Sequence, residues 1–70
     1  MLPDGAYDVI VVDAEREADG LRLDLTILAG AHKGEMVSTH ATGLAVDEIG
    51  ALGTPGTLTV RGGEPSLVLE

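Results

Sequence analysis

The sequence predicts one small, mostly β domain, an all-β barrel of five strands with a single short helix between the third and fourth strands. Three observations predict it. Residues 21–27 alternate strictly between apolar and polar side chains, glycine-rich turn signals separate several β-forming runs, and only residues 44–52 carry apolar residues at helical spacing. Because 70 residues suffice for one compact unit and no linker divides them, we expect a single domain over residues 1–70.

The first two strands are expected on either side of a polar connection. Tyr7–Val12 is rich in β-branched residues but lacks clean alternation, which is typical of a strand covered on both sides for part of its length. Residues 14–20 are polar and end in Asp19-Gly20, a strong turn signal. The second strand alternates strictly, so one face of it should be buried and is formed by Leu21, Leu23, Leu25 and Ile27.

The third strand and the helix follow a second hairpin. Residues 29–34 begin and end near glycines, and β-forming residues resume over Glu35–Ala41. Beyond this strand, Ala45, Ile49 and Leu52 lie at i, i+4 and i+7, and glycine and proline then stop the pattern. We expect a short helix whose apolar residues plug the open end of the barrel.

Two final strands complete the predicted order. Thr57–Arg61 alternates, Gly62-Gly63 supplies a tight turn, and residues 66–69 form the fifth strand, with Pro65 at its start. The predicted order is therefore β-β-β-α-β-β.

The composition limits the classes of function. The formal net charge is −8, there is no cysteine, and Tyr7 is the only aromatic residue. The missing thiols exclude disulfides, thiolate metal sites and thiol catalysis, and they suit a reducing cytoplasm, where we place the protein. The longest apolar run, Val9–Val12, is too short to span a bilayer, and the negative charge disfavours anionic membranes and phosphate backbones.

This order of elements resembles the OB-fold, a five-stranded, partly open Greek-key barrel with a helix between strands three and four. An SH3-like barrel is the main alternative, but its helical turn lies between the last two strands, where this chain has only residues 62–65. Residues 28–37, Leu-Ala-Gly-Ala-His-Lys-Gly-Glu-Met-Val, also resemble the hairpin of small single-strand-binding OB proteins of phages and bacteria, including actinobacteria.

The resemblance implies a binding surface on strands two and three and the flanking loops, with stacking aromatics and a basic track. In this chain that surface has few suitable residues. Those expected to contact nucleic acid or a partner protein are Tyr7, Arg22, Lys33, His40 and Arg61.

Catalytic, metal and cofactor sites are not predicted. Ser38 and His40 share a strand face and form the nearest approach to a hydrolytic pair, but no nucleophile elbow or phosphate-binding motif accompanies them. His32 and His40 match no zinc spacing, even with Glu35 or Asp24 as an additional ligand.

The leading hypothesis is therefore a non-catalytic OB-like module that contacts other proteins or a second copy of itself, as an accessory to a DNA replication, repair or phage assembly. The alternative is direct, weak binding of single-stranded nucleic acid through the face of strands two and three. A small-molecule hydrolase or transferase acting through Ser38 and His40 is the third and most distant hypothesis.

Overall fold

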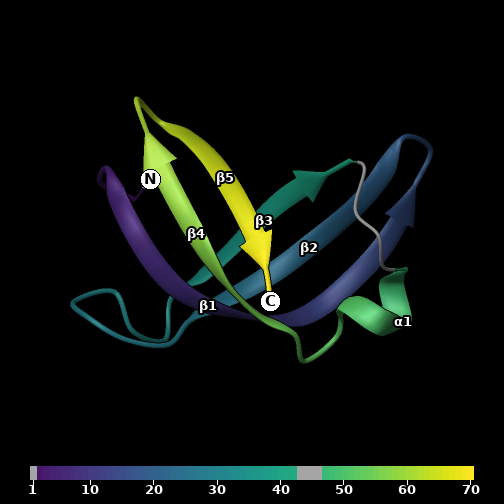
Figure 1. Cartoon of the computed structure of the whole chain (residues 1–70), viewed down its shortest axis with the longest axis horizontal. Coiled ribbons are helices and arrows are strands. Elements are labelled where there is room, and N and C mark those ends of the chain that lie inside the picture. The colour runs from purple at the N-terminus through teal and green to yellow at the C-terminus, as the bar shows by residue number, and fades with distance from the viewer. Residues whose placement is uncertain (1, 43–46) are drawn as a thin grey trace.

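Five antiparallel strands form one sheet in the order β3-β2-β1-β4-β5 in the computed structural model, which describes residues 2–42 and 47–70 (Figure 1). The mostly β composition and the position of the helix between the third and fourth strands are confirmed. The elements are β1 (Gly5–Glu17), β2 (Gly20–Ile27), β3 (Met36–Ala41), α1 (Glu48–Ala51), β4 (Pro55–Arg61) and β5 (Glu64–Leu69).

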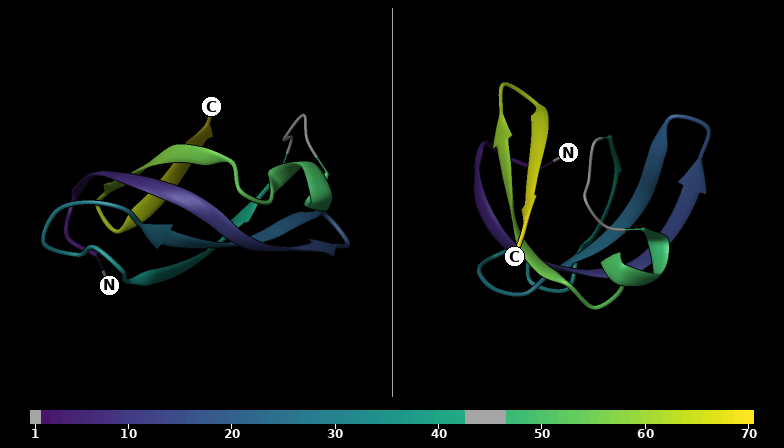
Figure 2. Two further views of the ribbon diagram at one scale, coloured as in Figure 1. Left: turned by 90° about the horizontal axis from the view of Figure 1, so that it is seen from below. Right: turned by 45° about the vertical axis from the view of Figure 1, so that its right-hand side comes forward.

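The sheet curls into a half-barrel because the two halves of β1 pair with different strands. Its first half pairs with β4 and its second half with β2, and only Val9 and Ile10 pair with both neighbours. A β-bulge at Val12 shifts the register between β1 and β2, and such bulges bend a strand and increase its twist. The β1–β2 and β4–β5 hairpins consequently stand as the arms of an open U (Figure 2).

The hydrophobic core lies on the inner face of this curl. The predicted buried face of β2 is confirmed, because Leu21, Leu23, Leu25 and Ile27 are each at most 5% exposed. Neighbouring strands and the helix complete the cluster with aliphatic side chains alone. The other core residues are Val9, Val11, Ala51, Leu58 and Val60.

The first strand is longer than the sequence predicts. Residues 14–17, expected in a polar connection, continue β1 to Glu17, and only Ala18 and Asp19 form the turn. Residues 14–17 are mostly polar because the sheet is covered on one face only. Glu15 lies opposite Arg22 and faces outward, whereas Ala14 faces the core. The polar connection was therefore predicted wrongly.

The described helix is a single turn, and its larger apolar residues do not plug the half-barrel as predicted. Asp47 caps it by accepting a hydrogen bond from the Gly50 amide (2.7 Å). Only Ala51 is buried, while Ile49 and Leu52 are 76% and 48% exposed. Leu44, Ala45 and Val46, also assigned to this helix from the sequence, lie outside the described residues. No helix in the described part of the chain has the length and apolarity needed to cross a membrane.

Candidate binding surfaces

The outer face of β1, β2 and β3, opposite the core, is acidic. Alternation along the part of β1 that pairs with β2 puts three carboxylates of β1 and one of β2 on this side. We call the four residues the acidic face: Asp13, Glu15, Glu17 and Asp24. The basic residues on the same face are Arg22 and His40, which is a cation when protonated. They lie opposite each other in β2 and β3. Negative charge therefore predominates on this surface.

Both basic groups of this face are held by carboxylates. The Arg22 guanidinium donates to Glu15 (Nη2–Oε2, 2.7 Å). His40 Nε2 lies 3.1 Å from Asp19 Oδ1, in the β1–β2 turn, and 3.6 Å from Glu17 Oε1. A phosphate approaching either residue would meet a carboxylate that is already in contact with it.

The predicted contact residues do not form one track. Arg22 and His40 lie together near the β1–β2 turn, whereas Lys33 lies in the β2–β3 loop at the other end of these strands. Arg61 ends β4, in the other arm of the half-barrel (Figure 1). These cations thus occupy three separate regions of the surface.

Tyr7 lies on the inner side of the sheet, opposite Leu58 of β4, and packs against the core. Its hydroxyl donates to the Pro3 carbonyl oxygen, and its ring meets His32 edge-on, with centroids 6.0 Å apart and planes at 79°. The Tyr7 ring thus packs against the core and contacts the N-terminal segment and the β2–β3 loop. It therefore does not lie with Arg22 and His40 on the outer face.

Ser38 and His40 share the outer face of β3 but contact different carboxylates. The Ser38 hydroxyl donates to Asp24 (2.6 Å), and His40 turns to Asp19. His32 lies in the loop before β3 and contacts Glu35 (2.5 Å). Within residues 2–42 and 47–70, no cluster of three or more potential ligands could hold a metal ion.

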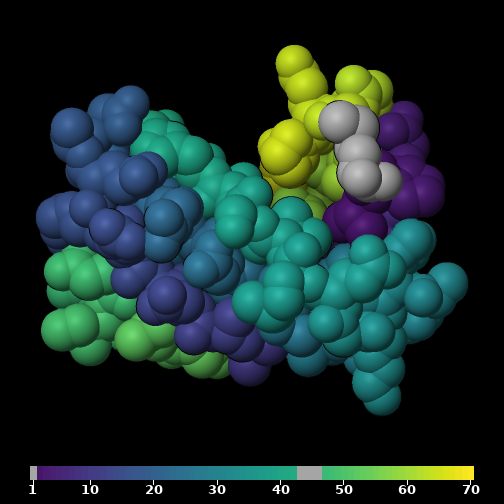
Figure 3. Space-filling model, turned by 180° about the vertical axis from the view of Figure 1, so that it is seen from behind, coloured from purple at the N-terminus to yellow at the C-terminus, as the bar shows by residue number. Residues whose placement is uncertain are grey.

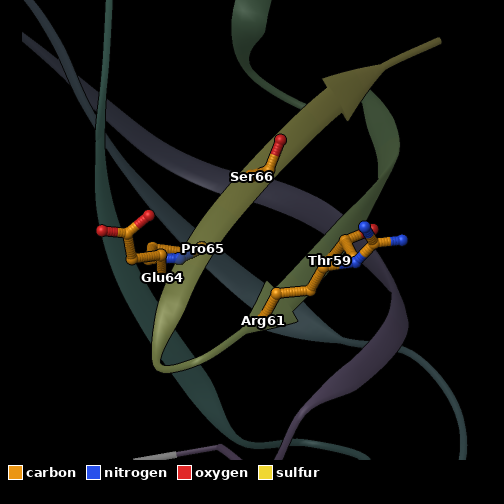
Figure 4. A pocket seen from close by; sticks show the side chains of 5 residues that line it. All are labelled: Thr59, Arg61, Glu64, Pro65 and Ser66. Carbon is orange, nitrogen blue, oxygen red and sulfur yellow. The ribbon is translucent and has the colours of Figure 1, made fainter.

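A polar hollow of about 360 Å³ lies on the β4–β5 hairpin. The Arg61 guanidinium lies beside Thr59 and points away from Glu64, its cross-strand partner (Figure 4). Pro65 and Ser66 complete the lining. The hollow offers one cation, one carboxylate and two hydroxyls.

An apolar cleft of about 140 Å³ lies where β3 and β5 face each other across the half-barrel. Val37 borders it from β3 and Pro65 from β5, and these two strands stand on either side of a notch in the space-filling view (Figure 3). The remaining lining residues are Leu2, Leu58, Val60 and Gly63. No sequence signal pointed to this cleft, because its residues come from four separate segments.

Searches against protein-family models, curated proteins and solved structures each found no match to this chain.

Proposed function

We propose that this chain is a non-catalytic, OB-like binding module whose ligand is another protein. The sheet order, with β1 between β2 and β4 and the helix between β3 and β4, supports the OB-like assignment. Only the Gly62-Gly63 turn lies between β4 and β5, which argues against the SH3-like alternative.

The acidic face is the observation that carries this proposal. In OB proteins that bind single strands, cations track the backbone and aromatic rings stack on bases. Here the corresponding face carries Asp24 of β2, it continues into Asp13, Glu15 and Glu17 of the neighbouring β1, and its arginine is paired with Glu15. Such a surface repels phosphates and attracts a basic protein surface.

The arrangement of hydroxyls and imidazoles supports a binding role over a catalytic one. A nucleophilic serine needs a base within hydrogen-bond reach and a group that orients the base. Ser38 donates to a carboxylate, and His40 contacts carboxylates at the β1–β2 turn. Ser38 and His40 therefore contact different carboxylates on the surface.

Affinity capture with two matched double variants tests the proposal. Asp13→Lys with Glu15→Lys reverses charge on the acidic face, and Glu64→Lys with Glu70→Lys makes the same change of net charge around β5. The full chain, immobilised and exposed to lysate of its own cells, should recover a basic protein that the first variant loses and the second retains.

Two results would overturn the proposal. One is equal recovery by both variants, which would make the contact a general charge effect. The other is tight binding of a single-stranded oligonucleotide by the unaltered chain, without recovery of any protein.

A further inference from the structure

Among residues 2–42 and 47–70, no strand pairs with the outer edges of β3 and β5, and these two free edges differ in how they are protected. Unpaired strand edges are templates for another strand, and proteins block them with proline and charged residues. The β5 edge begins with Glu64 and Pro65 and is followed by Glu70. The β3 edge has neither proline nor an acidic or lysine side chain along Met36–Ala41. Of the two edges, β3 is the one open to pairing.

The free backbone groups of β3 follow from the ladder with β2. The Ile27 amide donates to the Glu35 carbonyl oxygen (3.0 Å), so this position faces β2. Because the direction of these groups alternates along an antiparallel strand, Val37, Thr39 and Ala41 also face β2. Met36, Ser38 and His40 then direct their amide and carbonyl groups to the free edge.

A strand added to this edge would extend over the apolar cleft. Val37 faces inward from β3 and lines the cleft, so the inward side chains of an added strand would lie beside it. The volume of about 140 Å³ is close to that of a cavity of about 150 Å³ that accommodates benzene. One aliphatic or aromatic side chain would fill it.

The charged residues around β3 favour a basic ligand. Glu35 precedes the strand, Asp19 and Glu17 lie against His40 near its end, and Asp24 is one strand away on the outer side. An incoming strand would thus lie near Glu35 and Lys33 at one end of β3 and near Glu17 and Asp19 at the other, so carboxylates outnumber lysine around it, whereas Asp24 is two strands away. A second copy of the chain brings the same charge of −8 and is repelled, whereas a basic segment is attracted.

We propose that the free edge of β3 binds an extended segment of a basic partner protein, antiparallel to β3, with apolar side chains facing the cleft and lysine or arginine facing outward. This inference rests on the proposed protein-binding function and adds a strand-pairing site for the same basic ligand, at the β3 edge beside the acidic face. Main-chain hydrogen bonds to Met36, Ser38 and His40 hold the segment, and the cleft selects its alternate side chains.

Amide chemical shifts of the full-length, ¹⁵N-labelled chain test this site directly. The probe is acetyl-Lys-Val-Lys-Leu-Lys-Val-Lys-amide, and its control is the same peptide with Glu in place of every Lys. At millimolar concentration the lysine peptide should shift the amides of Met36, Ser38 and His40, and the glutamate peptide should not.

Adjacent residues on opposite faces of β3 provide matched variants. Val37→Gln should weaken the lysine peptide by about tenfold or more, equivalent to about 1.4 kcal/mol, whereas Met36→Gln should leave its affinity within about threefold. Ser38→Pro removes one free amide, with Ser38→Ala as the control for the lost hydroxyl. The amide spectrum of each variant shows that it is folded.

Three outcomes of the amide-shift measurement overturn this inference: no shifts with the lysine peptide, shifts confined to β5 or the outer face, or β3 shifts that appear when the protein alone is concentrated, which would make a second copy the occupant. A captured basic partner that binds Val37→Gln as well as the unaltered chain also overturns it, yet leaves the protein-binding function intact. Failure to capture any protein, with oligonucleotide binding instead, overturns both.

Discussion

Gly56 of β4 lies against the backbone of Val68 in β5, so close that a Cβ at Gly56 would sit 2.5 Å from the Val68 carbonyl oxygen. Because this neighbour is backbone, a side chain at position 56 must displace β5. We expect Gly56→Ala to lower the free energy of unfolding by about 1–3 kcal/mol, the usual range for overpacking. Urea denaturation measures the loss.

Gly30→Ala is the comparison for this effect. Nothing lies within 4 Å of a Cβ at Gly30, although its φ of +85° disfavours alanine. Gly30→Ala should therefore lose only the backbone preference, about 1 kcal/mol. Equal stability of Gly56→Ala and the unaltered chain would show that β5 is not packed as described.

The all-aliphatic core makes the domain sensitive to the loss of a single side chain. Leu25 is fully buried between Val11 and Val37 in the sheet register, and Leu28, just past the end of β2, is 43% exposed. We expect Leu25→Ala to cost about 2–5 kcal/mol and Leu28→Ala much less. Thermal unfolding of the two variants measures the difference, and similar losses would contradict the burial pattern.

The single helical turn should contribute to stability through Ala51 rather than through its larger apolar residues. Ala51 is fully buried, while Ile49 is 76% exposed. Ile49→Ser should change stability by less than about 0.5 kcal/mol, and Ala51→Leu should destabilise by about 1–3 kcal/mol through overpacking. Chemical denaturation tests both variants, and a large loss for Ile49→Ser would restore the plugging role that the sequence suggested.

Short sequence patterns correctly predicted the features of the fold that depend on residues adjacent in the chain. Strict alternation identified the buried face of β2, because one side of that strand is buried in the core and the other is partly exposed to solvent. Gly62 and Gly63 identified the β4–β5 turn, where both have positive φ. Both features depend on a few consecutive residues.

Features that depend on the curl of the sheet could not be predicted in this way. The bulge at Val12 interrupts the alternation of β1, so the run Val9–Val12 suggested burial on both sides although Val12 is 47% exposed. The acidic face requires the register that sets Glu15 opposite Arg22. The apolar cleft requires Val37 and Pro65 to converge across the half-barrel, which no linear pattern encodes.

Oligonucleotide binding should be weak, and removing cations should change it little. Arg22 already donates to Glu15, and Lys33 and Arg61 lie in separate regions. Since nucleic-acid affinity depends on several phosphate contacts made together, we expect no rise in fluorescence anisotropy for a labelled single strand at micromolar protein and physiological salt. Arg22→Ala with Lys33→Ala should give the same flat titration.

Charge reversal on the acidic face supplies the positive control for this measurement. Asp13→Lys with Glu15→Lys releases Arg22 from its carboxylate partner and adds two cations beside it. This variant should bind the same oligonucleotide measurably at low salt, and its binding should weaken steeply as salt rises, because each phosphate contact releases counterions. Comparable binding by the unaltered chain, abolished by Arg22→Ala with Lys33→Ala, would instead establish nucleic acid as the ligand of this face.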